Sequence, residues 1–251
     1  MPASFTFVMY AFMGLPLLVL LVFNLIGKKH TERCCLATGV AVGLIQVASA
    51  VITLVLLLQY NKDSVKFSQF WDMNASANAS YFALDVFSLV ALICIGMVSC
   101  AAFLTARTTI RDKAFNFTNV LMLLILGMNG IAMVTDLFSL YVFLEVTGIA
   151  SFILIALHRD IYGLEGSFKY LIMSAIASAF ILAGLAFIFM EGGSLQYDAV
   201  KTLLAGNGDI HNPVLLMLAM VFLTGGLAIK SGLMPFHGWL PDAYQSAPAP
   251  V

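Results

Sequence analysis

The sequence predicts an all-α integral membrane protein, a bundle of about seven transmembrane helices. Of the 251 residues, 61% are hydrophobic and 10% are charged, and the mean hydropathy is +0.99. The hydrophobic fraction and the mean hydropathy lie far above those of soluble domains, and the charged fraction lies far below. Apolar runs of the roughly 20 residues needed to cross a bilayer recur along the whole chain. The formal net charge of −1 provides no basic surface, which excludes nucleic-acid binding.

Seven apolar runs account for the predicted spans. The first has lysines after it rather than before it, which is the opposite of a cleaved signal peptide. Polar Thr135 and Asp136 separate the fourth run from the fifth, and Asp136 is expected to cap the helix that follows. Gly39 and Gly43 in the second have the spacing of closely packed membrane helices. In chain order the spans cover Phe5–Gly27, Leu36–Tyr60, Phe82–Ala106, Phe117–Thr135, Leu137–Leu157, Phe168–Met190 and Val214–Trp239.

Basic residues predict the orientation, because Lys and Arg favour cytoplasmic loops. The loops after the first, third and fifth spans hold seven basic residues, and the loops after the second, fourth and sixth hold three. The seven are Lys28, Lys29, Arg33, Arg107, Arg111, Lys113 and Arg159, and the three are Lys62, Lys66 and Lys201. This alternation places the N-terminus outside and the end of the seventh span inside.

Besides Asp85, which stands at the start of the third run and is expected at the interface, three charged residues lie within the apolar runs, where a charge at the bilayer centre costs on the order of 2.5 to 3.5 kcal/mol. Glu145 stands near the middle of the fifth span, Lys169 near the start of the sixth, and Lys230 within the seventh. Lys230 and Glu145 are expected to pair, because each needs a partner from another helix. Three alternatives stay open: a Lys169 that reaches the interface, a neutral packing role for Glu145, and a static pair that only fixes helix register.

The seventh span is expected to break near Lys230, because Gly232, Pro235, Gly238 and Pro241 follow it closely. Irregular backbone at membrane depth is tolerated only against protein or a water-filled cavity. Burial favours the neutral forms of lysine and glutamate, whereas an opposite charge nearby favours the charged forms. A buried lysine whose glutamate partner approaches or retreats can therefore take up and release a proton.

The four cysteines, Cys34, Cys35, Cys94 and Cys100, show no CxxC spacing, and no histidines stand at ligand spacing. We therefore expect no metal site, no iron–sulfur cluster and no cofactor in this chain. Haem ligand pairs and nucleotide-binding loops are also missing from the sequence. Any electron transfer would have to use other subunits.

Three segments carry a family resemblance. Residues 230–251, "KSGLMPFHGWLPDAYQSAPAPV", resemble the broken seventh helix and following loop of the antiporter-like proton-translocating subunits. These subunits are shared by respiratory complex I (NADH:quinone oxidoreductase), Mrp cation/proton antiporters and membrane-bound energy-converting NiFe hydrogenases. "LYVFLEVTGIASFILIAL" resembles the fifth helix of that family, and "FKYLIMSAIAS" resembles the start of the sixth.

The resemblance implies roles for four residues in proton transfer. Lys230 would be the central proton-carrying lysine, Glu145 its modulating partner, and Lys169 an input-side member of the half-channel. His237 stands where the family has a histidine near the break, although a lone histidine would otherwise be read as structural. Tyr244 departs from the family, since many relatives have a second histidine there.

The resemblance also implies a domain organisation. Residues 1–110 would form three N-terminal transmembrane helices, and residues 111–251 an incomplete first antiporter repeat of helices four to seven. The eighth helix and the second repeat are absent from the sequence. The expected partners are a chain or segment that supplies the missing helices, other membrane subunits, and peripheral redox subunits with iron–sulfur clusters. The expected location is the inner (cytoplasmic) membrane of a bacterium or archaeon.

The sequence therefore predicts a proton-translocating membrane subunit of a redox-driven complex, without a redox centre of its own. One alternative is a subunit of an Mrp-type sodium/proton antiporter driven by an ion gradient. Another is an assembly or anchoring subunit that moves no ion. Carboxylate and hydroxyl groups are too few to define a sodium cage, which favours protons over sodium.

Overall fold

The structure, a computed structural model, describes most of the chain. The described residues are 3–27, 34–59, 64–68, 80–110, 113–158, 160–205 and 212–251. Contacts divide the chain into two compact units, residues 1–134 with 248–251 and residues 135–247. The division falls one helix later than the boundary expected at 110/111. The assignment of helices four to seven to an antiporter repeat stays a prediction.

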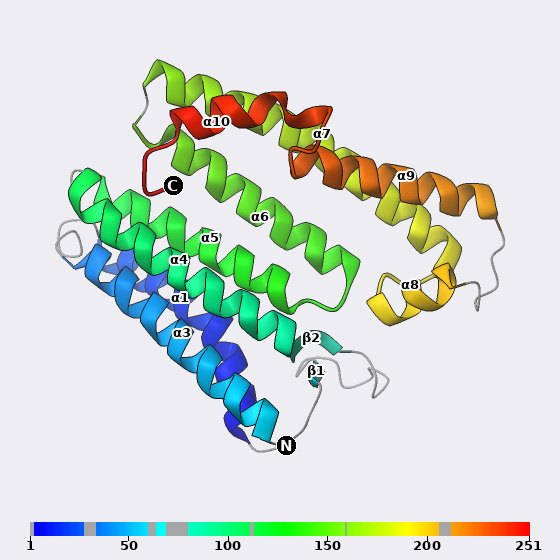
Figure 1. The fold of residues 1–251 in the computed structure, drawn as a ribbon, viewed down its shortest axis with the longest axis horizontal. Helices are drawn as coiled ribbons and strands as arrows, with labels where there is room; N and C mark the ends of the chain where they lie inside the picture. Colours follow the sequence, from blue (N-terminus) through cyan, green and yellow to red (C-terminus); the bar gives the residue numbers. More distant parts are fainter. Residues whose placement is uncertain are drawn as a thin grey trace. The chain divides into compact units, whose positions relative to one another are not determined.

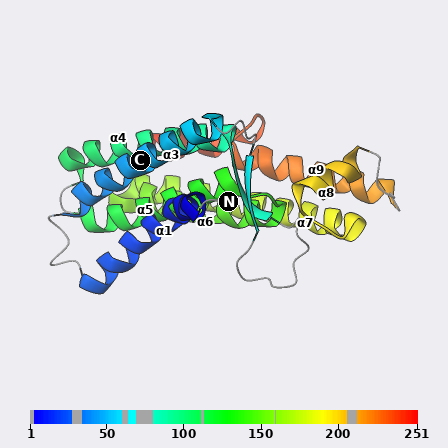
Figure 2. The same ribbon diagram turned by 90° about the horizontal axis from the view of Figure 1, so that it is seen from below.

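The first unit is a helical bundle with one small hairpin (Figures 1 and 2). Its elements are α1 (Ala3–Ile26), α3 (Cys35–Gln59), β1 (Ser64–Ser68), β2 (Ser80–Asp85), α4 (Val86–Thr109) and α5 (Ala114–Met133). Helices α3 and α4 lie side by side (Figure 1). A Cβ on Gly43 would lie 3.2 Å from the carbonyl oxygen of Gly96 on α4, which confirms the predicted close packing.

A buried amide pair ties the four helices of this unit together. The side-chain amides of Gln46 on α3 and Asn129 on α5 donate to each other, at 2.9 and 3.1 Å. Gln46 also donates to the Leu92 carbonyl on α4, and Asn129 to the Phe12 carbonyl on α1 at 2.9 Å. Pro16 has no N–H for the Phe12 carbonyl four residues before it. The Asn129 amide replaces that missing helical hydrogen bond.

The hairpin is the part of this unit that the apolar pattern did not predict. β1 pairs antiparallel with β2, which leads directly into α4. Asp85 caps α4 by accepting a hydrogen bond from the Ser88 N–H at 2.6 Å. Most of the basic loop residues that gave the orientation lie outside the described residues, so the orientation stays a prediction.

The second unit is all-helical and carries the three charged residues of interest. Its elements are α6 (Leu137–Ile155), η1 (Ala156–His158), α7 (Ile161–Gly192), α8 (Tyr197–Leu204), α9 (Pro213–Lys230), η2 (Phe236–Trp239) and α10 (Leu240–Ser246). Helix α9 lies alongside α7, and α10 alongside the first part of α7 (Figure 1). Asp136 caps α6 by accepting from the Ser139 N–H at 2.7 Å, which confirms the predicted cap.

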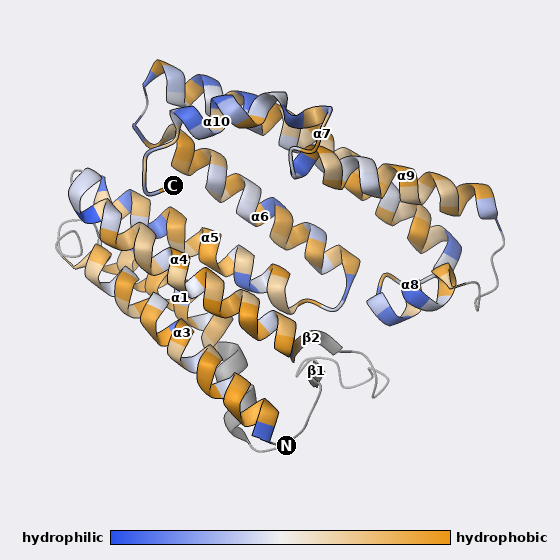
Figure 3. Cartoon of the chain, in the orientation of Figure 1, coloured by the Kyte–Doolittle hydropathy of each residue, from blue (hydrophilic) through white to orange (hydrophobic). Residues whose placement is uncertain are grey.

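The apolar character of the helices agrees with a membrane protein. Among the described residues, six helices are long and apolar enough to cross a bilayer: 35–59, 86–109, 114–133, 137–158, 161–192 and 213–230. The described side chains of α1 add a shorter apolar stretch, Ala11–Ile26. Figure 3 shows apolar residues along these helices and more hydrophilic ones on α8 and α10. All seven predicted spans are therefore helices, which confirms the fold class.

Candidate functional site

Helix α9 ends at Lys230 because the chain turns into a left-handed conformation two residues later. Gly232 has a φ of +66°, which glycine adopts without steric cost. Its N–H donates to the Ile229 carbonyl at 3.1 Å, and the Leu233 N–H donates to the Ala228 carbonyl at 2.9 Å. These two bonds form a Schellman motif. The predicted break near Lys230 is confirmed, but both carbonyls are bonded to the chain, not left free.

Lys230 makes an ion pair with Glu145, as expected from the sequence. The Lys230 Nζ lies 2.5 Å from the Glu145 Oε1. The Lys230 side chain is 9% exposed and that of Glu145 is 28% exposed. Glu145 stands midway along α6, so the pair joins the middle of one spanning helix to the end of another. A charge pair this poorly solvated interacts far more strongly than one in water.

Helix α7 supplies a third member of this site, Ser178. Its Oγ lies 2.5 Å from the same Glu145 oxygen that Lys230 contacts, and 2.7 Å from the Ser174 carbonyl oxygen. The hydroxyl has one hydrogen and can donate it to only one of these two acceptors at a time. Sequence reasoning missed Ser178. The sequence pattern that could have identified it is a row of hydroxyl residues spaced three or four apart. This spacing places them on one face of α7: Ser167, Tyr170, Ser174 and Ser178.

Gly148 leaves space beside the pair, one turn after Glu145 on α6. A Cβ added there would lie 3.3 Å from the Ser174 Oγ, and 3.9 Å from both the Lys230 Nζ and the Tyr170 hydroxyl. Three polar groups from α7 and α9 thus face the one point of α6 that has no side chain. Polar groups that converge in this way can hold a bridging water molecule.

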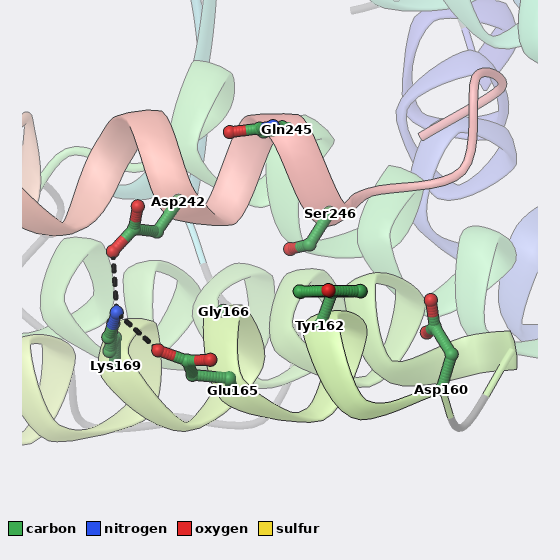
Figure 4. A pocket seen from close by; sticks show the side chains of 8 residues that line it. All are labelled: Asp160, Tyr162, Glu165, Gly166, Lys169, Asp242, Gln245 and Ser246. Atoms are coloured by element: carbon green, nitrogen blue, oxygen red, sulfur yellow. Dashed lines mark hydrogen bonds and ion pairs between the residues drawn. The ribbon is translucent and has the colours of Figure 1, made fainter.

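Lys169 belongs to a different cluster, shown in Figure 4. Its Nζ lies 2.7 Å from the Glu165 Oε1, one turn away on α7, and 2.7 Å from the Asp242 Oδ2 on α10. The Lys169 side chain is 42% exposed. Its backbone lies nine residues before Ser178, about 13.5 Å along the helix. The sequence grouped Lys169 with Lys230 and Glu145, whereas the structure separates them into two clusters.

A pocket of about 380 Å³ opens beside Lys169. Its walls are mostly polar and come from the first turns of α7 and from α10 (Figure 4). The lining residues are Asp160, Tyr162, Glu165, Gly166, Lys169, Asp242, Gln245 and Ser246. Three carboxylates against one ammonium give the pocket a net negative charge, which attracts cations and protons.

His237 is the fourth residue that the sequence singled out, and it stands apart. It lies in η2, seven residues after Lys230, and its side chain is exposed. No hydrogen bond joins it to the Lys230–Glu145 pair among the described residues. The described ranges also contain no group of three or more His, Cys, Asp or Glu side chains placed to hold a metal ion. The proton-transfer roles assigned to all four residues stay predictions.

The fold and the site define a multi-pass membrane protein in which a poorly solvated Lys–Glu pair joins two spanning helices. Residues 134–251 match the family described as NADH:quinone oxidoreductase/Mrp antiporter, transmembrane. Residues 134–251 therefore carry a domain of this family, as the resemblance in the sequence implied. The match begins where the second structural unit begins, so the part that carries the pair is also the part that defines the family.

Curated and solved proteins agree with this assignment. The NADH-quinone oxidoreductase subunit N of Halorhodospira halophila is 30% identical over 185 residues, covering 72% of this chain and 38% of that protein. A chain of an archaeal membrane-bound sulfane sulfur reductase is 27% identical with a TM-score of 0.81, covering 97% of this chain and 48% of that one. A chain of the Mrp complex from Dietzia sp. is 27% identical with a TM-score of 0.78, covering 96% and 44%. The chain spans less than half the length of each of these proteins.

Proposed function

We propose that this chain translocates protons as a membrane subunit of a redox-driven complex, with the Lys230–Glu145 pair as its proton-carrying site. The observation that carries the proposal is this pair, which lies within the residues that match the family. Ionisable residues inside membrane-spanning segments typically mark ion pathways, because their cost in a bilayer is otherwise uncompensated.

The geometry supports a switch between two proton-binding states of Lys230. With the Glu145 carboxylate at 2.5 Å, the charged ammonium is favoured. If the two side chains move apart, the poorly solvated ammonium loses that attraction and can release its proton. One N–H bond then breaks, and the proton passes to a neighbouring water molecule. Ser178 can still donate to Glu145 in this state, which leaves the carboxylate with a hydrogen-bond partner.

The relatives support the redox-driven setting. One is named as a subunit of NADH-quinone oxidoreductase, and another belongs to a respiratory membrane complex. We therefore propose that other membrane subunits accompany this chain. Peripheral partner subunits would carry the redox centres, including iron–sulfur clusters, because the cysteine pattern provides no such site in this chain. The inner membrane of a bacterium or archaeon is the proposed location.

The second candidate function is an Mrp-type antiporter subunit, which would exchange sodium for protons. The similarity to the Mrp complex, with a TM-score of 0.78, supports it. The two functions differ in their energy source. Isolating the native complex separates them: iron–sulfur subunits in the complex support the redox-driven function. A complex without redox subunits that exchanges ions along an imposed sodium gradient supports the antiporter.

The test of proton translocation is the Lys230→Ala variant in the native complex, reconstituted into sealed vesicles. The proposal expects loss of proton movement attributable to this chain while the complex still assembles. Lys201→Ala is the matched control, because Lys201 is an exposed lysine on α8 in the same unit. An assembled Lys230→Ala complex that moves protons like the wild type would reject the proposal and leave an anchoring role.

A further inference from the structure

Tyr170 stands between the two charged clusters and belongs to neither. It follows Lys169 on α7, and its ring stacks on that of Trp239, with centroids 4.7 Å apart and planes at 15°. The Trp239 indole N–H donates to the Ile229 carbonyl at 3.3 Å, beside Lys230. The stack therefore fixes the tyrosine ring against the end of α9.

The Tyr170 hydroxyl lies near Gly148 of α6, on the side of Lys230. The Tyr170 hydroxyl lies 3.9 Å from the position that a Cβ on Gly148 would occupy. The Lys230 Nζ lies 3.9 Å from the same position. Water molecules can bridge a gap of this size, and such a bridge is nearly as favourable as a direct hydrogen bond. The Tyr170 hydroxyl is therefore within water-mediated reach of the lysine.

Apolar side chains pack around the Tyr170 ring. The buried cluster around Tyr170 consists of Ile155, Trp239 and Ala243, with Met173, Leu240 and Ala247 packed against it. Within this cluster the polar side-chain groups are the Tyr170 hydroxyl and the Trp239 N–H, and the N–H already has a partner. Tyr170 follows Lys169 on α7 and its hydroxyl lies near Gly148, beside Lys230, so it stands along a route from the pocket to the lysine. The tyrosine hydroxyl is the group of the cluster that can both accept and donate one.

We propose that Tyr170 is a proton-transfer residue that connects the polar pocket beside Lys169 to the Lys230–Glu145 pair. The inference rests on the proposed function. In the step, a hydronium ion on the pocket side gives a proton to the Tyr170 oxygen. The original O–H bond breaks, and its proton passes through water to the neutral amine of Lys230. On the tyrosine one O–H bond forms as another breaks, so it ends neutral as it began; overall, one O–H bond of the hydronium ion breaks, leaving water, and one N–H bond forms on Lys230.

The direct test is Tyr170→Phe in the intact complex, with proton movement measured in sealed vesicles. Phenylalanine keeps the ring and its stack on Trp239, so the complex should assemble. We expect proton movement to fall about tenfold or more, because a positioned proton-transfer group typically contributes 10²-fold or more. Tyr244→Phe is the matched control: it removes the hydroxyl of an exposed tyrosine on α10 and should behave as wild type.

A fluorinated tyrosine at position 170 adds a measurement that a purely structural role would not change. It keeps the hydroxyl and the shape of the ring but makes the hydroxyl more acidic. We expect the pH profile of proton movement to shift towards lower pH. This variant also tests the inference if Tyr170→Phe fails to assemble, and an unshifted profile would overturn it.

Lys230→Ala, measured in the same preparations, distinguishes a failure of the inference about Tyr170 from a failure of the proposed function. If Lys230→Ala abolishes proton movement and Tyr170→Phe equals wild type, Tyr170 is not on the route and the proposed function stands. If Lys230→Ala itself equals wild type, the proposed function fails, and the inference about Tyr170 fails with it.

Discussion

Removing Glu145 should destabilise the protein more than removing Lys230. In Glu145→Leu, a lysine side chain that is 9% exposed loses the one ion-pair partner it has among the described residues. Breaking a buried pair from one side costs about 3 to 5 kcal/mol, and the 28% exposure of Glu145 favours the lower end, about 3 kcal/mol. In Lys230→Met, Glu145 keeps the Ser178 hydroxyl as a donor and keeps contact with solvent. We expect that loss to be about 1 to 2 kcal/mol.

The double variant Glu145→Leu with Lys230→Met completes the cycle. Replacing both members of a buried pair by apolar residues is often neutral or stabilising, so the double variant should be more stable than Glu145→Leu alone. The assay is the unfolding free energy of the protein purified in detergent. If Glu145→Leu costs less than about 1 kcal/mol and the double variant costs the same, the pair is not a buried one and the reasoning is refuted.

Three further tests, made with four substitutions, probe other parts of the structure through unfolding and ion movement. Asn129→Leu should cost about 2 kcal/mol in unfolding free energy, because it leaves the Phe12 carbonyl without its donor. Pro16→Ala should reduce that cost by restoring the helical N–H, and equal costs in both backgrounds would contradict the account. Gly232→Ala should lower stability by about 1 to 2 kcal/mol, since its φ of +66° strains any other residue; an unchanged thermal midpoint would count against the motif. Lys169→Met should change stability by less than about 1 kcal/mol, because its ion pairs are exposed, while slowing proton movement in vesicles; a large unfolding effect would show a structural role instead.

Much of the fold followed from apolar run length. The seven spans and the Asp136 cap could be predicted because burial in lipid and helix capping leave local signals. The break after Lys230 was also predicted, from the glycines and prolines that follow it. The hairpin of β1 and β2 was not, because β1 is short and lies outside the apolar runs, while β2 leads into the third run and was read as its beginning. The sequence also could not show that the freed carbonyls at the break are bonded within the chain.

The site was predicted in part. Lys230 and Glu145 stood out because charges in apolar runs need partners, and the structure pairs them. Asp242 was not predicted as the partner of Lys169, because it lies 73 residues further along the chain, on a short helix outside the apolar runs. Ser178 and Tyr170 were missed because hydroxyls are common in membrane helices and carry no charge to draw attention.

The central claim is that the Lys230–Glu145 pair carries protons, and one measurement tests it most directly. Proton movement by the native complex in sealed vesicles should be compared between wild type and the double variant Glu145→Leu with Lys230→Met. The double variant should assemble and keep wild-type stability, so a loss of proton movement could not be ascribed to unfolding. The account predicts that the contribution of this chain is lost. Wild-type proton movement by the assembled double variant would contradict it.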